Sequence, residues 1–164
     1  MADNFIGDIE SIAQRIRAEI ARGPLRPDDA PSRQRLITVL EHVLEAELAC
    51  AARYEHEHRL ASAVHGAEAA KPFAELAQEE LDHARLIADR LAALGKVASV
   101  EPLAPAKNGR GHTIEDLVRS DIVAERMIVN TYERIAEWTS ACDADTTELM
   151  RDMIESEELH SAIR

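Results

Sequence analysis

The stretch AELAQEELDHARLIADRL, residues 74–91, decides the fold of this chain. Its apolar residues recur at spacings of three and four, which is the period of one face of an α-helix. The same face carries Glu80 and His83, although carboxylates are rarely buried without a partner. The stretch therefore predicts a core-facing helix whose apolar stripe is Phe73, Leu76, Glu80, His83 and Ile87.

A second copy of this pattern lies in the other half of the chain. Two glutamates are 33 residues apart in the first half (80 − 47) and 32 apart in the second (157 − 125). One such motif on a glutamate-rich chain is weak evidence for a site. Two copies with the same elements in the same order indicate a duplicated helical hairpin. The motifs are Glu47-x6-Tyr54 with Glu80-x-x-His83, and Glu125-x6-Tyr132 with Glu157-x-x-His160.

The repeated glutamates lie on stripes that must pack together in a helical bundle. Four carboxylates facing one another cannot all stay ionised without counter-charge, and two divalent cations would supply it. Carboxylate and imidazole donors suit iron, manganese or zinc. The other three stripes are Ile37, Leu40, Leu44, Glu47, Ala51 and Tyr54; Leu117, Asp121, Glu125, Ile128, Tyr132 and Ile135; and Leu149, Met153, Glu157 and His160.

The two-fold repeat predicts how the ligands divide between two metal ions. One ion is expected at Glu47 and His83, and the other at Glu125 and His160. Glu80 and its counterpart in the second half would bridge them. The full predicted ligand set is Glu47, Glu80, His83, Glu125, Glu157 and His160.

Glycine and proline divide the chain into predicted helices. Brief connections make the second and third helices antiparallel, and likewise the fourth and fifth, whereas residues 96–112 form a long irregular crossover. One long crossover is typical of ferritin-like folds. We therefore predict an all-α, ferritin-like four-helix bundle over 31–164, preceded by an N-terminal helix and linker over 1–30. The predicted helices are about 4–22, 32–64, 71–95 (with Pro72 in the first turn), 113–140 after the cap Thr113, and 145 onward with a capping box from Asp145 to Glu148.

Charge and composition limit the partners. The formal net charge is −12, and such a surface repels nucleic acids and anionic membranes. No apolar run could cross a bilayer, the N-terminus has no apolar leader, and Cys50 and Cys142 form no CxxC pair. We expect a cytoplasmic protein without nucleic-acid or membrane partners. The apolar face of the N-terminal helix could cover its own bundle, a neighbouring subunit or another partner.

Over about residues 36–164 the chain resembles the bacterioferritin branch of the ferritin-like superfamily. The resemblance implies a ferroxidase that oxidises Fe(II) with O₂ or H₂O₂ at a di-iron centre and stores Fe(III) inside a homo-oligomeric shell built from dimers. It implies two irons per subunit, with the six residues above as ligands and catalytic residues. The segments that carry it are Glu47-Leu-Ala-x4-Tyr54, Glu80-x-x-His83, Val118-Arg-Ser-Asp121-x3-Glu125 and Glu157-x-x-His160.

Three further residues are expected just behind the ligands. The hydroxyls of Tyr54 and Tyr132 should hydrogen-bond carboxylates there, although simple core filling is an equal alternative. Asp121 lies one turn from Glu125 and is a candidate for supporting the centre or for the path of iron.

The resemblance is incomplete in three respects. Haem-binding bacterioferritins have a methionine where this chain has Leu81, so haem is not expected. The chain ends four residues after His160, and residues 1–30 form an additional N-terminal segment. Two alternatives therefore stay open: a non-storage di-iron oxidase or peroxidase of the same superfamily, and a non-catalytic helical protection or scaffold protein. Native metal, oxidant, assembly size and mineral core are likewise open.

Overall fold

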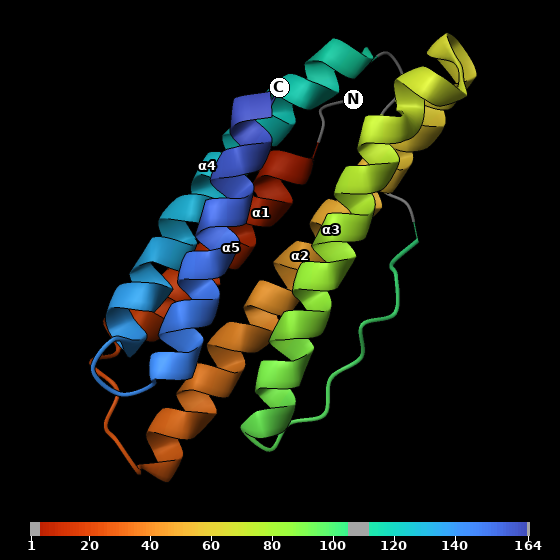
Figure 1. The fold of residues 1–164 in the computed structure, drawn as a ribbon. Coiled ribbons are helices and arrows are strands. Elements are labelled where there is room, and N and C mark those ends of the chain that lie inside the picture. Colours follow the sequence, from red (N-terminus) through yellow and green to blue (C-terminus); the bar gives the residue numbers. More distant parts are fainter. Residues whose placement is uncertain (1–3, 105–111, 164) are drawn as a thin grey trace.

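The computed structural model describes residues 4–104 and 112–163, and every regular element in that part of the chain is a helix (Figure 1). Four long helices form the bundle, and the N-terminal helix lies against it. This confirms the predicted all-α four-helix bundle with an additional N-terminal helix. The helices are α1 (Phe5–Ala21), α2 (Ala30–His65), α3 (Ala67–Ala93), α4 (Ile114–Thr139) and α5 (Ala144–Ile163).

The bundle consists of two antiparallel hairpins joined by the crossover. Gly66 alone separates α2 from α3, and its φ of +91° is a conformation that glycine adopts without steric cost. Residues 140–143 join α4 to α5. After α3, residues 96–104 run back alongside the bundle (Figure 1), with Val97 and Leu103 beside Leu44 and Leu48 of α2.

The irregular crossover is confirmed for residues 96–104 and 112, which contain no helix. Pro105, Gly109 and Gly111, which contributed to that prediction, lie outside the described residues. Gly95 ends α3 with a φ of +95°, as expected for a left-handed cap.

Two helices begin earlier than predicted, α2 by two residues and α3 by four. Helix α2 begins at Ala30 because the carboxylate of Asp29 accepts the backbone N–H of Ser32 at 2.9 Å. Helix α3 begins at Ala67 rather than near Pro72. This proline lies in the second turn, where its missing N–H leaves one helical hydrogen bond unmade without ending the helix.

The predicted cap of α4 is confirmed, whereas the predicted cap of α5 is wrong. Thr113 caps α4 as predicted, and its side chain and that of Asp116 each bond the other's backbone N–H. Helix α5, in contrast, begins before Asp145. The carboxylate of Asp143 accepts the N–H of Thr146 at 3.1 Å, so the capping box predicted at Asp145 is wrong.

Helix α1 lies over the seam between α2 and α4. Its buried isoleucines, together with Ala46 of α2 and Ile128 and Tyr132 of α4, line a common small hollow. Burying one such side chain contributes about 1.5–3 kcal/mol. Of the three roles left open by the sequence, the structure therefore shows α1 covering its own bundle. The buried residues are Phe5, Ile9, Ile12, Ala13 and Ile16.

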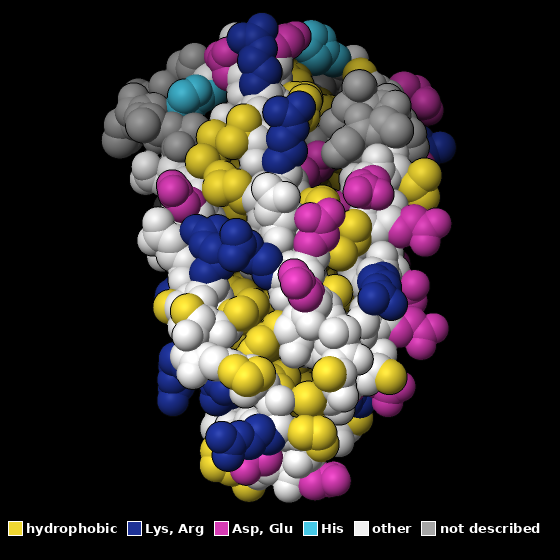
Figure 2. Space-filling model, turned by 90° about the vertical axis from the view of Figure 1, so that its left-hand side faces the viewer, with side chains coloured by type: hydrophobic (Ala, Val, Ile, Leu, Met, Phe, Trp, Pro, Cys, Tyr) yellow, Lys and Arg dark blue, Asp and Glu magenta, His cyan; other side chains and the backbone are white. Residues whose placement is uncertain are grey.

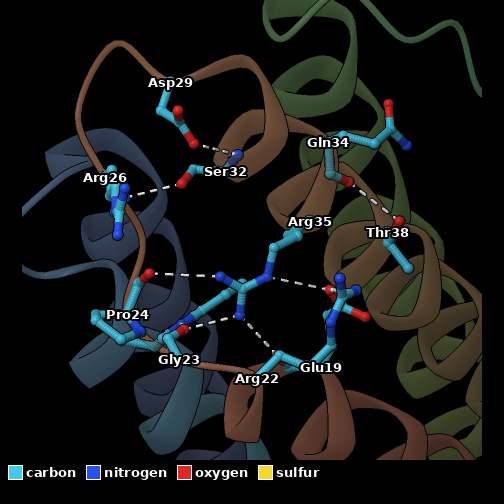
Figure 3. A network of polar contacts seen from close by, with 11 residues as sticks. Glu19, Arg22, Gly23, Pro24, Arg26, Asp29, Ser32, Gln34, Arg35 and Thr38 are labelled. Carbon is cyan, nitrogen blue, oxygen red and sulfur yellow. Dashed lines mark hydrogen bonds and ion pairs between the residues drawn. The ribbon is translucent and has the colours of Figure 1, made fainter.

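The linker after α1 is held to the bundle by Arg35 of α2 (Figure 3). Its guanidinium donates to the backbone oxygens of Glu19 at 2.8 Å and Gly23 at 2.7 Å. Trp138 of α4 also donates to the Gly23 oxygen, at 3.1 Å, and its ring lies under the Arg35 guanidinium. Polar bonds from two bundle helices thus hold the linker in place.

On the α4 flank, acidic and basic side chains are intermixed with hydrophobic and uncharged ones (Figure 2). Within residues 4–104 and 112–163, no helix has both the length and the apolar character needed to cross a bilayer.

Candidate metal centre

Each of the four bundle helices places carboxylates in the centre of the bundle. Because each donor occupies a position on the apolar stripe of its helix, packing turns it inward. The four glutamates are at most 3% exposed, and the two histidines are 7–8% exposed. The residues are Glu47 on α2, Glu80 and His83 on α3, Glu125 on α4, and Glu157 and His160 on α5.

Four of these residues form a compact group. Glu47, Glu80, His83 and Glu157 each offer a donor atom, and these atoms all lie within 4.8 Å of one another. The Nδ1 of His83 is 3.5 Å from the Oε2 of Glu47, 3.5 Å from the Oε2 of Glu80 and 3.8 Å from the Oε1 of Glu157. One imidazole nitrogen therefore faces three carboxylates from three helices.

His160 lies outside this group but faces the same two bridging candidates. Its Nδ1 is 4.0 Å from the Oε1 of Glu80 and 3.9 Å from the Oε2 of Glu157. Glu80 and Glu157 thus each turn one oxygen to His83 and the other to His160. The two imidazole rings stack with centroids 6.5 Å apart. Two carboxylates shared between two nitrogens match a site for a pair of cations.

Glu125 also lies outside the four-residue group. Its carboxylate accepts a hydrogen bond of 2.6 Å from the hydroxyl of Tyr54. Its negative charge contributes to the raised pKa values of Glu80 and Glu157, so it belongs to the same electrostatic cluster.

The two tyrosines cross between the halves of the bundle. Tyr132 of α4 donates to the Oε1 of Glu47 on α2 at 2.5 Å, and Tyr54 of α2 donates to Glu125 on α4. We expected these hydroxyls to bond carboxylates behind the ligands, whereas they bond the predicted ligands themselves. The hydroxyl of Tyr132 holds one oxygen of Glu47 while the other oxygen faces His83.

Protonation compensates for the crowding of carboxylates. Burial, and then the charge of Glu47, raise the pKa of Glu157 to about 8. Burial, and then the charges of Glu47 and Glu157, raise the pKa of Glu80 well above its ordinary value. Burial pushes the pKa of Glu47 upward too, but the close polar contacts with Glu80 and His83 outweigh it and the net pKa is lowered. Burial lowers the pKa of His83, but the close contact with Glu47 and the negative charge of that carboxylate raise it overall. Without metal, protons therefore provide the positive charge.

The donor atoms fit a metal pair because several of them lack any other role. Four buried donor atoms of this cluster have no hydrogen-bond partner among residues 4–104 and 112–160, whereas buried polar atoms in native proteins are almost always bonded. Oxygen and imidazole donors suit iron, manganese and zinc. The atoms are the Oε2 of Glu47, the Oε2 of Glu80, the Nδ1 of His83 and the Nδ1 of His160.

The outer nitrogen of each histidine has a partner that the sequence pattern did not indicate. The Nε2 of His83 is 3.1 Å from the hydroxyl of Ser156 on α5, and the Nε2 of His160 contacts the carboxylate of Glu79 on α3. Such partners orient a metal-binding imidazole. Both residues lie beside the stripe rather than on it, so helical periodicity alone could not identify them.

Asp121 is buried, but its observed partner is a cation and not a ligand of the centre. The Nε of Arg53 is 2.9 Å from Asp121 and 3.2 Å from Glu57, and its Nη2 donates to the backbone oxygen of Leu117. Arg53 and Glu57 are fully buried. This network was not predicted from the sequence, although the opposite charges of Arg53 and Glu57, four residues apart on α2, were a usable signal.

The fold and the site together define a helical bundle with a buried carboxylate–histidine cluster suited to metal. A family model described as "Ferritin-like domain" matches residues 37–162. The chain therefore belongs to the ferritin-like family, and the cluster fits a di-iron protein of that family. No curated protein matches the chain.

Proposed function

We propose that the chain is a bacterioferritin-type ferroxidase that takes two Fe(II) ions as substrate and oxidises them to Fe(III). Each Fe(II) loses one electron, and the two electrons reduce O₂ with two protons to H₂O₂, or reduce H₂O₂ with two protons to two waters. The observation that carries this proposal is the shared pair Glu80 and Glu157, which face both histidines. The proposed ligands are Glu47, Glu80, His83, Glu125, Glu157 and His160.

The protein's contribution is charge, position and exclusion of water. Four carboxylates neutralise two divalent ions and favour the higher charge of Fe(III) over Fe(II). The hydroxyls of Tyr132 and Tyr54 hold Glu47 and Glu125, so these carboxylates need little reorganisation when iron binds. Burial of the glutamates keeps bulk water from competing for the ions.

Several features are proposed along with this activity. They are iron storage or detoxification in the cytoplasm, a homo-oligomer built from dimers, and a centre without haem because Leu81 occupies the position of the usual methionine ligand. The bundle over 31–164 is proposed as the catalytic domain, with 1–30 as an appended helix and linker.

An anaerobic Fe(II) titration followed by exposure to O₂ tests the proposal. We expect a break at two irons per chain and rapid Fe(III) formation, measured by absorbance and O₂ consumption. Glu80→Gln should abolish rapid oxidation, because it removes a carboxylate shared by both ions. Glu75→Gln makes the same charge change at an exposed position of α3 and should keep it. Oxidation at the rate of free Fe(II), or equal rates in both variants, would refute the proposal.

A further inference from the structure

The two histidines of the centre are held by chemically different groups. On α5, the outer nitrogen of His160 contacts the carboxylate of Glu79, which reaches across from α3. On α3, the outer nitrogen of His83 lies 3.1 Å from the hydroxyl of Ser156, which reaches across from α5. The contacts are reciprocal between the helices but differ in charge.

The two partners of the histidines, Glu79 and Ser156, occupy equivalent positions of the internal repeat. Glu79 directly precedes Glu80, and Ser156 directly precedes Glu157. The same position of the repeated motif therefore serves the histidine of the opposite helix in both halves. It holds a carboxylate in the first half and a hydroxyl in the second, while the ligand positions around it are identical in type.

An ionised carboxylate and a hydroxyl have different effects on an imidazole. A carboxylate only accepts, so Glu79 fixes the proton of His160 on Nε2 and leaves the lone pair of Nδ1 toward Glu80 and Glu157. Its negative charge also makes that imidazole a stronger donor to metal. A serine hydroxyl can donate or accept, so Ser156 supplies no charge and does not fix the tautomer of His83.

We propose that Glu79 and Ser156 make the two metal positions unequal, with the His160 position taking the first cation. Glu79 acts as a positioning residue through His160. This inference rests on the proposed function in that it treats both histidines as metal ligands. It adds an order of binding that the symmetric ligand set alone does not contain.

Equilibrium titration of the metal-free protein with Co(II), followed by visible absorbance, tests the order without iron oxidation. Repulsion between two cations separates the binding steps in any paired site, so the comparison between variants is diagnostic. Glu79→Ser makes the two halves alike and should weaken the first step about 10- to 100-fold, the usual effect of losing such a partner. Ser156→Ala should leave the first step unchanged and weaken only the second. Glu79→Asp should restore part of the loss.

The outcomes separate this inference from the proposed function. If the unaltered protein binds two Co(II) ions but Glu79→Ser leaves the first step unchanged, the order of binding is wrong and the ferroxidase proposal stands. A weaker first step in Ser156→Ala would also overturn it. Failure of the unaltered protein to bind two ions would overturn both. Exposed Glu75→Gln is the control for loss of one negative charge on α3.

Discussion

Removing metal should make the stability of this protein fall as the pH rises. Glu157 is 2% exposed, and burial together with the charge of Glu47 raises its pKa from 4.5 to about 8. In the unfolded chain the same carboxyl ionises near its ordinary value. Between these two pH values the folded apo-protein binds more protons than the unfolded chain, so the free energy of unfolding decreases with increasing pH.

The pKa difference sets the size of the effect. At about 1.4 kcal/mol per pKa unit, a rise from 4.5 to about 8 corresponds to a loss on the order of 5 kcal/mol. The raised pKa values of Glu80 and His83 act in the same direction, because each favours the folded state while protonated. The lowered pKa of Glu47 acts only in more acidic solution, where its contribution is lost as the pH falls.

Urea unfolding of chelator-treated protein from about pH 5 to about pH 8 measures this dependence. Glu157→Gln should flatten the slope and should make the apo-protein more stable than the unaltered chain near the upper limit. Glu155→Gln, at an exposed position of the same helix, should keep the original slope. Restoring the metal should also flatten it. A constant or rising stability of the unaltered apo-protein, or equal slopes in the two variants, would refute the reasoning.

Three further changes test contacts around the centre. Tyr132→Phe removes the hydroxyl that donates to Glu47 and should lower the free energy of unfolding, measured in urea, by about 1.5–3 kcal/mol, as for bonds to charged groups. Arg53→Met leaves the carboxylate of Asp121 buried without its cation and should cost about 3–5 kcal/mol in thermal unfolding. Arg35→Ala removes the bonds that hold the linker and should speed amide hydrogen exchange in α1 more than in the bundle.

Each change has an outcome that contradicts it. An unchanged urea midpoint for Tyr132→Phe would mean that its hydroxyl does not stabilise the cluster. For Arg53→Met the matched control is exposed Arg59→Met on the same helix, and equal losses in the two would exclude a buried ion network. For Arg35→Ala the control is exposed Arg33→Ala, and a uniform rise in exchange over all helices would argue against selective docking.

The sequence predicted the helices and their inward faces because helical period is a local property. Glu80 and His83 share a stripe with apolar residues, so their common direction followed from spacing alone. The spacing did not predict which side chains of the other helices they contact. The crossing of Tyr132 to Glu47 depends on how α2 and α4 are placed, and no spacing within either helix encodes it.

Other features were not predicted correctly from the sequence, because they depend on weak local signals or on positions beside the apolar stripe. Glu79 lies next to the stripe of α3, where an exposed glutamate is the ordinary interpretation, and only the neighbouring helix reveals its partner. The start of α3 was misplaced because Pro72 is a frequent first-turn residue, while here Gly66 alone makes the turn. The six-residue ligand set stays a prediction until metal is bound.

The placement of α1 makes the two sides of the buried centre differ in how thickly they are covered. Isoleucines of α1 and the hydroxyl of Tyr132 lie between the outside and Glu47 on the seam of α2 and α4. Toward α3 and α5 the covering is thin, since Glu79, with a side chain 48% exposed, directly touches His160. Two matching halves therefore differ in their surroundings: the glutamates are at most 3% exposed, whereas the histidines on the side away from α1 are 7–8% exposed.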